Sequence, residues 1–262
     1  MNYDRSCSSC SKESYKTVPL GRIFEKLDEC FSKNDLYSAG RLLDYWENEA
    51  RALHDLRGLL EILNEKIGYY RRTNEKEKAF AAIEEAFELI DGRGIGDRIS
   101  IGTIYVNGAT TMKAFGHANE AMYYYRKAEE IYHSTAISDN DYRFAALYNN
   151  WSSACKDVGD FERSEELCFK AIDILKQKDT YNGEIAVSLI NIAHLYYDKS
   201  PFDERIYQLI DEAWERLMSK SNVRDGNFAF FCSKCYPSFG FFGYFEREAE
   251  LKALTEKIYA RN

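Results

Sequence analysis

Two cysteine pairs are the first residues whose spacing could do chemistry. Cys7-x2-Cys10 and Cys232-x2-Cys235 each have the spacing of half a four-thiolate zinc site. They lie at opposite ends of the chain, so one ion could join them only if the N-terminus folded across or two chains met. We therefore expect no metal site and no cofactor. The seven cysteines, an odd number, indicate reduced thiols rather than a disulfide framework.

Catalytic patterns are also weak in this sequence. The stretch Gly92-x-Gly94-x-Gly96 has glycines like a phosphate-binding loop, but it follows a predicted helix and lacks the Lys-Ser/Thr that such loops carry, so we interpret it as a connector. The four histidines are too scattered to form a ligand set or an acid/base pair: His54, His117, His133 and His194. No nucleophile, base and orienting group form a recognisable arrangement. We therefore expect no catalytic residues and no enzymatic activity.

Amide and basic side chains recur at a fixed spacing. Counted along successive repeat units, equivalent positions carry Asn64, Val106, Asn149 and Asn191, then Glu65, Asn107, Asn150 and Ile192, and further along Arg71, Lys113, Lys156 and Asp198. Asn is a poor residue inside a helix because its amide competes with the backbone for hydrogen bonds. Its recurrence therefore calls for a reason.

A row of amides could hold the backbone of an extended peptide, since each amide offers two donors and an acceptor. The basic row beside it would attract acidic side chains or a terminal carboxylate. The predicted peptide-binding residues are Asn64, Arg71, Asn107, Lys113, Asn149, Asn150, Lys156 and Asn191. The alternative is that these Asn side chains are solvated or bond between neighbouring helices.

The elements that would position these rows are clearest between Arg143 and Leu175. This stretch has the pattern of two amphipathic helices joined by a tight turn, in which Gly159 can adopt the positive φ that ends a helix. Asp160 is then placed to cap the second helix. Small residues stand where the two helices would touch, at Ser152, Ser164 and Ala171.

The same unit returns along the chain at a near-constant interval. Small or aliphatic markers of the second helix, at Ala79, Ala121, Ser164 and Ile206, are separated by 42, 43 and 42 positions. A second set keeps the same intervals, at Ala86, Ala128, Ala171 and Ala213. Two sets of markers in phase through four units indicate an internal repeat.

At these residues the chain resembles the tetratricopeptide (TPR) repeat, a helix-turn-helix unit with the pattern W-x2-L-G-x2-Y, then A-x3-F, then A and P. The longer period is similar to the units of kinesin light chains and of bacterial Rap-type peptide-sensing regulators. The resemblance implies an all-α, right-handed α-solenoid whose first helices line a concave face. There are departures: His133 and Lys176 stand where Pro usually closes the second helix, and Trp151 replaces the usual Leu.

The sequence divides into about five to six predicted helix pairs. They cover residues 20–53, 56–91, 98–134, 141–177, 183–220 and 226–261, with Asp97 and Asp203 placed to cap helices. We expect residues 1–17 to be a mobile polar segment and residues 18–262 to form one domain.

Composition restricts the partners. The formal net charge of −8 argues against a protein that coats nucleic acid or an anionic membrane. No apolar run approaches a membrane span, and the first residues, MNYDRSCSSCSKES, lack the apolar core of a signal peptide, so we expect a cytoplasmic protein. Aromatic residues reach 15%, and only 3 Pro interrupt the chain, which favours long helices.

The sequence therefore predicts a non-enzymatic scaffold that recognises an extended, acidic protein or peptide segment in a concave groove. One alternative is a ligand-responsive regulatory module of a signalling or transcription pathway. Another is a structural role, in which the aromatic last pair, Phe228 to Phe245, joins two copies as a homodimer. An enzyme is the third class, and a deep pocket lined by paired carboxylates would favour it.

Overall fold

The computed structural model describes residues 17–260, which contain twelve α-helices and no strand. The helices are α1 (Leu20–Ser32), α2 (Leu36–Ala52), α3 (Leu56–Thr73), α4 (Lys76–Phe87), α5 (Arg98–Ala114), α6 (Ala118–His133), α7 (Tyr142–Asp157), α8 (Phe161–Leu175), α9 (Asn182–Lys199), α10 (Arg205–Met218), α11 (Gly226–Phe241) and α12 (Phe245–Tyr259). A π-helical turn, Glu88–Gly92, extends α4, and a 3-10 turn, Asp179–Tyr181, precedes α9. All six predicted pairs are present. Cys7, Cys10 and nearly all of the predicted N-terminal segment lie outside the described residues.

Turns between the paired helices follow the local chemistry of the sequence. Gly159 has φ 82°, in the left-handed region that favours glycine, and Asp160 then caps α8 by accepting a hydrogen bond from the Arg163 backbone N–H at 3.2 Å. Asp97 caps α5 as expected, through Ser100 at 3.0 Å. At the start of α10, the side chain of Asp203 accepts from the first helical N–H, that of Arg205, at 3.0 Å.

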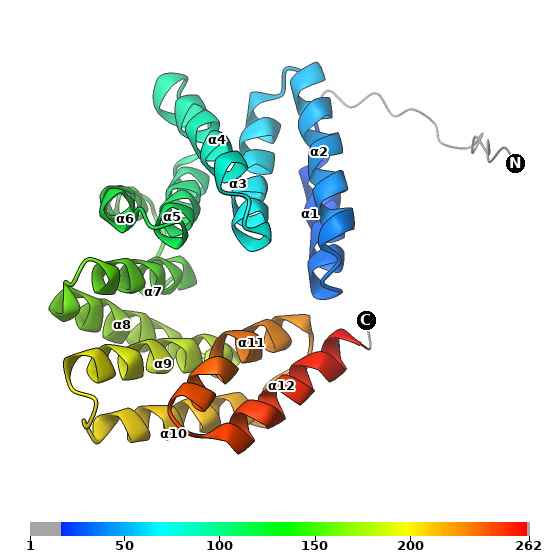
Figure 1. Ribbon diagram of the computed structural model, residues 1–262. Coiled ribbons are helices and arrows are strands. Elements are labelled where there is room, and N and C mark those ends of the chain that lie inside the picture. The colour runs from blue at the N-terminus through cyan, green and yellow to red at the C-terminus, as the bar shows by residue number, and fades with distance from the viewer. Residues whose placement is uncertain (1–16, 261–262) are drawn as a thin grey trace, which may run out of the picture.

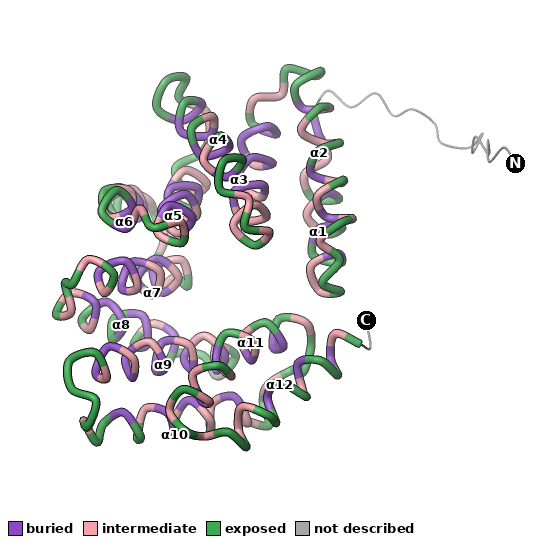
Figure 2. Tube along the Cα trace, in the orientation of Figure 1, coloured by how far each residue is buried: buried purple, intermediate pink, exposed green. Residues whose placement is uncertain are grey.

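The repeat markers are buried where helices approach one another. Ala79, Ala121, Ser164 and Ile206 are at most 3% exposed, and Ala86, Ala128, Ala171 and Ala213 are fully buried. A small side chain lets two helix backbones approach closely. The interval of 42 or 43 residues between the markers therefore corresponds to one close helix contact in each successive pair. Figure 2 shows buried segments on the faces that helices turn toward each other, with most connecting loops exposed.

The pairs stack side by side and curve strongly (Figure 1). Each odd-numbered helix from α3 to α11 packs against the next odd-numbered one, so these helices form the inner layer and the even-numbered helices the outer layer. The curvature brings the last pair back to the first, where α11 touches α1. A Cβ built on Gly226, the first residue of α11, would lie 3.1 Å from the Cα and O of Ser32 at the end of α1. The solenoid is therefore nearly closed on itself.

Candidate functional site

The predicted Arg and Asn rows make hydrogen bonds between neighbouring inner helices. Arg71 of α3 donates to Asn107 Oδ1 and to Thr111 Oγ1 of α5, each at 2.7 Å. Asn107 in turn donates through Nδ2 to the backbone carbonyl of Asn64 at 2.8 Å and to its Oδ1 at 3.1 Å. These bonds connect α3 to α5 in both directions, so part of the predicted site holds the stack together.

The lysines of the same row form ion pairs with the following repeat. Lys113 Nζ of α5 lies 3.3 Å from Asp157 Oδ2 at the end of α7. Lys156 Nζ of α7 lies 3.0 Å from Asp198 Oδ2 of α9. Both lysines are partly buried, and each already has a carboxylate partner, so neither offers an unpaired charge to a ligand.

The remaining asparagines keep free hydrogen-bonding atoms. Asn149 Oδ1 accepts from the buried hydroxyl of Ser188 on α9 at 2.8 Å, which leaves its NH2 group without a partner among the described residues. Asn150 donates to the Ala146 carbonyl at 2.8 Å, which leaves its Oδ1. Asn191 is half-buried and makes no hydrogen bond to the described part of the chain. These amides can still pair with a peptide backbone.

A hollow of about 780 Å³ opens on the inner side of the solenoid where its two ends meet. A second hollow of about 430 Å³ adjoins it. Both are lined by Phe31 of α1, Arg72 of α3, Phe230 of α11 and Tyr259 of α12, and we call the two together the seam pocket. The larger hollow adds further polar and charged residues to this shared lining: Asn34, Glu65, Arg71, Ser233 and Lys234.

Three cations of the seam pocket have no carboxylate within 4 Å among the described residues: Arg71, Arg72 and Lys234. Arg71 bonds only to neutral groups, and Arg72 donates to Asn34 Oδ1 at 2.8 Å while its guanidinium lies 5.5 Å from the centre of the Phe31 ring. Lys234 Nζ lies 5.3 Å from the centre of the Phe230 ring. Its pKa is lowered by desolvation and by the neighbouring charges of Arg71, Arg72 and Lys113.

Solved structures share this architecture. BtubC (BKLC) from P. vanneervenii is 18% identical, with a TM-score of 0.56 over 88% of this chain and 91% of that chain. A putative kinesin light chain from Podosopora anserina, with nearly identical TPR-like repeats, is 14% identical, with a TM-score of 0.52 over 77% of this chain and 95% of that one. The fold is that of a TPR-like repeat protein. No family model matches the chain, and no curated protein matches its sequence.

The seam pocket of this TPR-like solenoid also contains an unusual carboxyl group. Glu65 makes no hydrogen bond or ion pair with the described residues. Burial raises its pKa to about 7, and the negative charges of Asp28 and Glu61 act in the same direction. The pocket therefore has a cationic part, on α3 and α11, and a carboxyl group on α3 that is readily protonated. Two further carboxyl groups, Asp28 of α1 and Asp225 just before α11, line its smaller hollow.

Sequence reasoning found Arg71 and missed Arg72, Phe31, Phe230 and Lys234. Their positions belong to no common row, because the first two pairs and the last pair contribute them from opposite ends of the chain. The crowding of aromatics in α11 was visible in the sequence, but the residues facing that helix across the seam were not.

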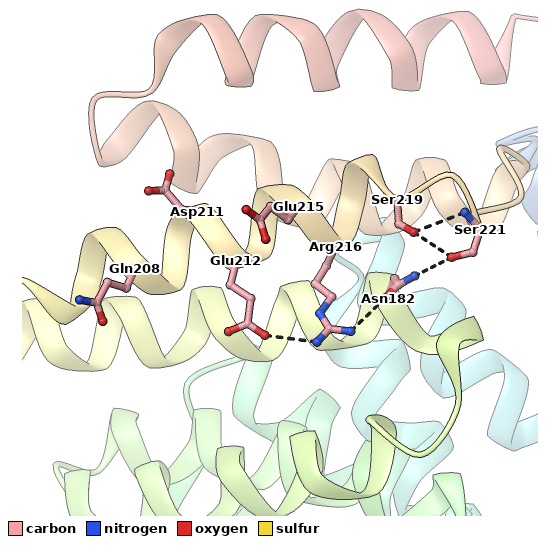
Figure 3. Close-up of a pocket in the computed structure, with 8 residues that line it drawn as sticks. All are labelled: Asn182, Gln208, Asp211, Glu212, Glu215, Arg216, Ser219 and Ser221. Carbon is pink, nitrogen blue, oxygen red and sulfur yellow. Dashed lines mark hydrogen bonds and ion pairs between the residues drawn. The ribbon is translucent and has the colours of Figure 1, made fainter.

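Another hollow of the TPR-like solenoid, about 820 Å³, lies along α10 and is polar and open. Figure 3 shows Glu212 and Arg216 projecting from one side of α10 toward Asn182, and Asp211 and Glu215 projecting from the other. Arg216 pairs with Glu212 at 3.3 Å, and Asp211 pairs with Arg247 at 2.6 Å. Because most of these charges are satisfied locally, we regard the seam pocket as the stronger candidate.

Metal and membrane signals are weak in the described residues. No group of three His, Cys, Asp or Glu side chains is placed to hold a metal ion. Cys232 and Cys235 are fully buried in α11, and burial raises the pKa of both thiols, that of Cys232 to about 12. His194 packs against Phe241 and Phe242 and hydrogen-bonds Ser238 at 2.9 Å. No helix of this range is long and apolar enough to span a bilayer.

Proposed function

We propose that this TPR-like solenoid is a non-catalytic scaffold that binds an extended acidic segment of a partner protein, with the seam pocket as its anchor. The observation that carries the proposal is the convergence of Arg71, Arg72 and Lys234 on one hollow without a carboxylate partner among the described residues. Grouped cations repel each other, and an anion that enters the hollow gains charge-assisted hydrogen bonds. Arg71 is half-buried, whereas Arg72 and Lys234 are exposed, so solvent screens their part of this gain. The chain as a whole has a formal net charge of −8, so this group of cations differs in sign from the chain's net charge.

The inner helices offer a path for the rest of the segment. The free amide atoms of Asn149, Asn150 and Asn191 belong to α7 and α9, which continue the inner layer away from the seam. We propose that they pair with the backbone of the segment, while Lys113 and Lys156 support the stack through their aspartate partners. Binding would then combine a charged anchor with contacts that do not depend on the side chains of the partner.

Calorimetric titration of the full chain with the hexapeptide Glu-Asp-Phe-Glu-Glu-Leu tests the anchor. We expect the double variant Arg72→Gln plus Lys234→Gln to bind at least about tenfold more weakly, which corresponds to about 1.4 kcal/mol. The matched control is Arg126→Gln plus Lys252→Gln, which makes the same change in net charge at exposed positions of α6 and α12. An equal loss in both variants would show a general field effect, and no binding by the unmodified chain would refute the proposal.

A second candidate function is self-association through the last pair. Phe241 at the end of α11 is 56% exposed and Phe245 at the start of α12 is 70% exposed, which is unusual for such large apolar side chains. Light scattering over a range of concentrations tests this candidate. A mass that stays at that of one chain at every concentration would remove it, and a dimer that Phe245→Ser converts to monomer would support it.

A further inference from the structure

The two ends of the solenoid meet with little to hold them together. Ser32 of α1 and Gly226 of α11 approach closely, and a Cβ on Gly226 would lie 3.1 Å from backbone atoms of Ser32, which is tighter than an ordinary contact. Among the described residues that line the seam pocket, no hydrogen bond or ion pair crosses from the first two pairs to the last pair. Besides the approach of Ser32 and Gly226, the side-chain contacts that these residues offer across the seam are therefore apolar. The aromatic residues shared by the two hollows are Phe31, Phe230 and Tyr259.

Charges of both signs line the seam pocket, since Asp28 of α1 and Asp225 before α11 line its smaller hollow, but its three cations gather in the larger hollow. Arg71 and Arg72 belong to α3, whereas Lys234 belongs to α11, so closing the solenoid brings cations from its two ends toward one hollow. The lowered pKa of Lys234 reflects this proximity, after the larger effect of desolvation. These like charges repel each other across the hollow, and solvent screens part of the repulsion because Arg72 and Lys234 are exposed. An anion between them would turn this repulsion into attraction.

From this geometry we infer that the bound acidic segment closes the solenoid: it contacts both ends at once, and its binding is coupled to the approach of α1 and α11. The inference rests on the proposed function, and it adds that the site is composite and incomplete in an open solenoid. The segment that fits carries carboxylates beside an aromatic or aliphatic side chain. The carboxylates face Arg72 and Lys234, and the apolar side chain packs among the aromatic residues of the seam.

Coupling of this kind is reciprocal. If the ligand favours the closed form, then any change that favours the open form must lower the affinity for the ligand by the same factor. A substitution that pushes the two ends apart should therefore lower affinity even though it removes no charged group and no aromatic ring from the pocket. This consequence separates the coupled site from a site that is already complete.

Gly226→Val is the substitution that should push the two ends apart, because its Cβ would lie 3.1 Å from the backbone of Ser32. The matched control is Gly21→Val in α1, where an added Cβ meets nothing within 4 Å. Both replace a helical glycine by the same β-branched residue. With the hexapeptide Glu-Asp-Phe-Glu-Glu-Leu as the probe, we expect Gly226→Val to bind at least about fivefold more weakly than the control.

Small-angle X-ray scattering and hydrogen exchange on the unmodified chain measure closure directly and need no variant. We expect the peptide to lower the radius of gyration and to protect amides at the end of α1 and the start of α11. The same peptide with Gln and Asn in place of its acids should do neither, and inorganic phosphate should not substitute for the acidic peptide.

The possible failures are distinguishable. If the acidic peptide binds the unmodified chain but changes neither the radius of gyration nor the exchange of α1 and α11, the coupling is overturned and the binding scaffold stands. Equal affinity of Gly226→Val and Gly21→Val also overturns it. If the peptide does not bind at all, both the scaffold and the coupling are refuted.

Discussion

Lys156 Nζ of α7 lies 3.0 Å from Asp198 Oδ2 of α9, and both residues occupy the same position of successive repeat units. The basic row predicted from the sequence therefore ends at Asp198, which is the counterion of Lys156. The equivalent residue one repeat earlier, Lys113, pairs with Asp157. At the seam, by contrast, Arg71, Arg72 and Lys234 have no carboxylate within 4 Å among the described residues.

Replacing Lys156 by Met should affect the stack more than the ligand. We expect affinity for the acidic hexapeptide to stay within about twofold, because the lysine charge is already neutralised by Asp198. The free energy of unfolding should fall by no more than about 1 kcal/mol, since the pair is partly exposed to solvent. Urea denaturation and calorimetric titration measure the two effects. A loss of affinity as large as that of Arg72→Gln plus Lys234→Gln would place the anchor on α7 instead of at the seam.

Replacing Glu65 by Gln should remove a pH dependence of stability. The pKa of Glu65 is raised from 4.5 to about 7 in the folded chain, so between these values the unfolded chain gives up the proton that the folded chain keeps. Folding therefore loses stability as pH rises through this window, by up to about 3 kcal/mol, and the loss is complete above pH 7. Below pH 4.5 the group contributes no difference.

We accordingly expect Glu65→Gln to be more stable than the unmodified chain at pH 8 and equally stable at pH 4. Urea denaturation at the two pH values measures this difference. Because Glu65 lines the same hollow as Arg71 and Lys234, the substitution should also strengthen binding of the acidic hexapeptide at pH 8. A variant that is destabilised at pH 8 would mean that the carboxylate has a favourable partner there.

Replacing Gly183 by Ala should destabilise the packing of α9 against α11. A Cβ at Gly183 would overlap Cδ2 of Phe231, and that ring would have to move. We expect a loss of about 1–3 kcal/mol, the usual cost of overpacking. Gly21→Ala, at an open position in α1, is the control and should gain up to about 1 kcal/mol from helix propensity. Thermal unfolding compares them, and equal stability of the two variants would contradict the tight packing.

A chelator should leave thermal unfolding of the chain unchanged. Cys232 and Cys235 are fully buried and their raised pKa values disfavour the thiolates that zinc requires. Differential scanning calorimetry with and without EDTA measures this. A drop in the melting temperature on adding EDTA, reversed by zinc, would show a metal site that includes one of these pairs.

The helix pairs could be predicted from the sequence because their causes are local. Gly159 and Asp160 define a turn through φ and a side-chain cap, and Ala86 or Ala171 marks a close helix contact through its size alone. Such signals act within one unit, and repetition made them visible. The rows on the inner helices were predicted for the same reason. The alternative stated for the Asn side chains, bonds between neighbouring helices, agrees with the hydrogen bonds of Asn107 and Asn149.

Only the tertiary structure decided which of these side chains have partners and where the two ends of the chain lie. Closure depends on a small rotation from each pair to the next, which accumulates over the whole stack, and no single residue encodes it. Lys234 and Arg72 are more than half the chain apart in sequence, so no spacing rule connects them. The sequence by itself determined a repeating helical scaffold with amide and basic rows. The curvature of that scaffold decided that the unpaired cations meet at the seam.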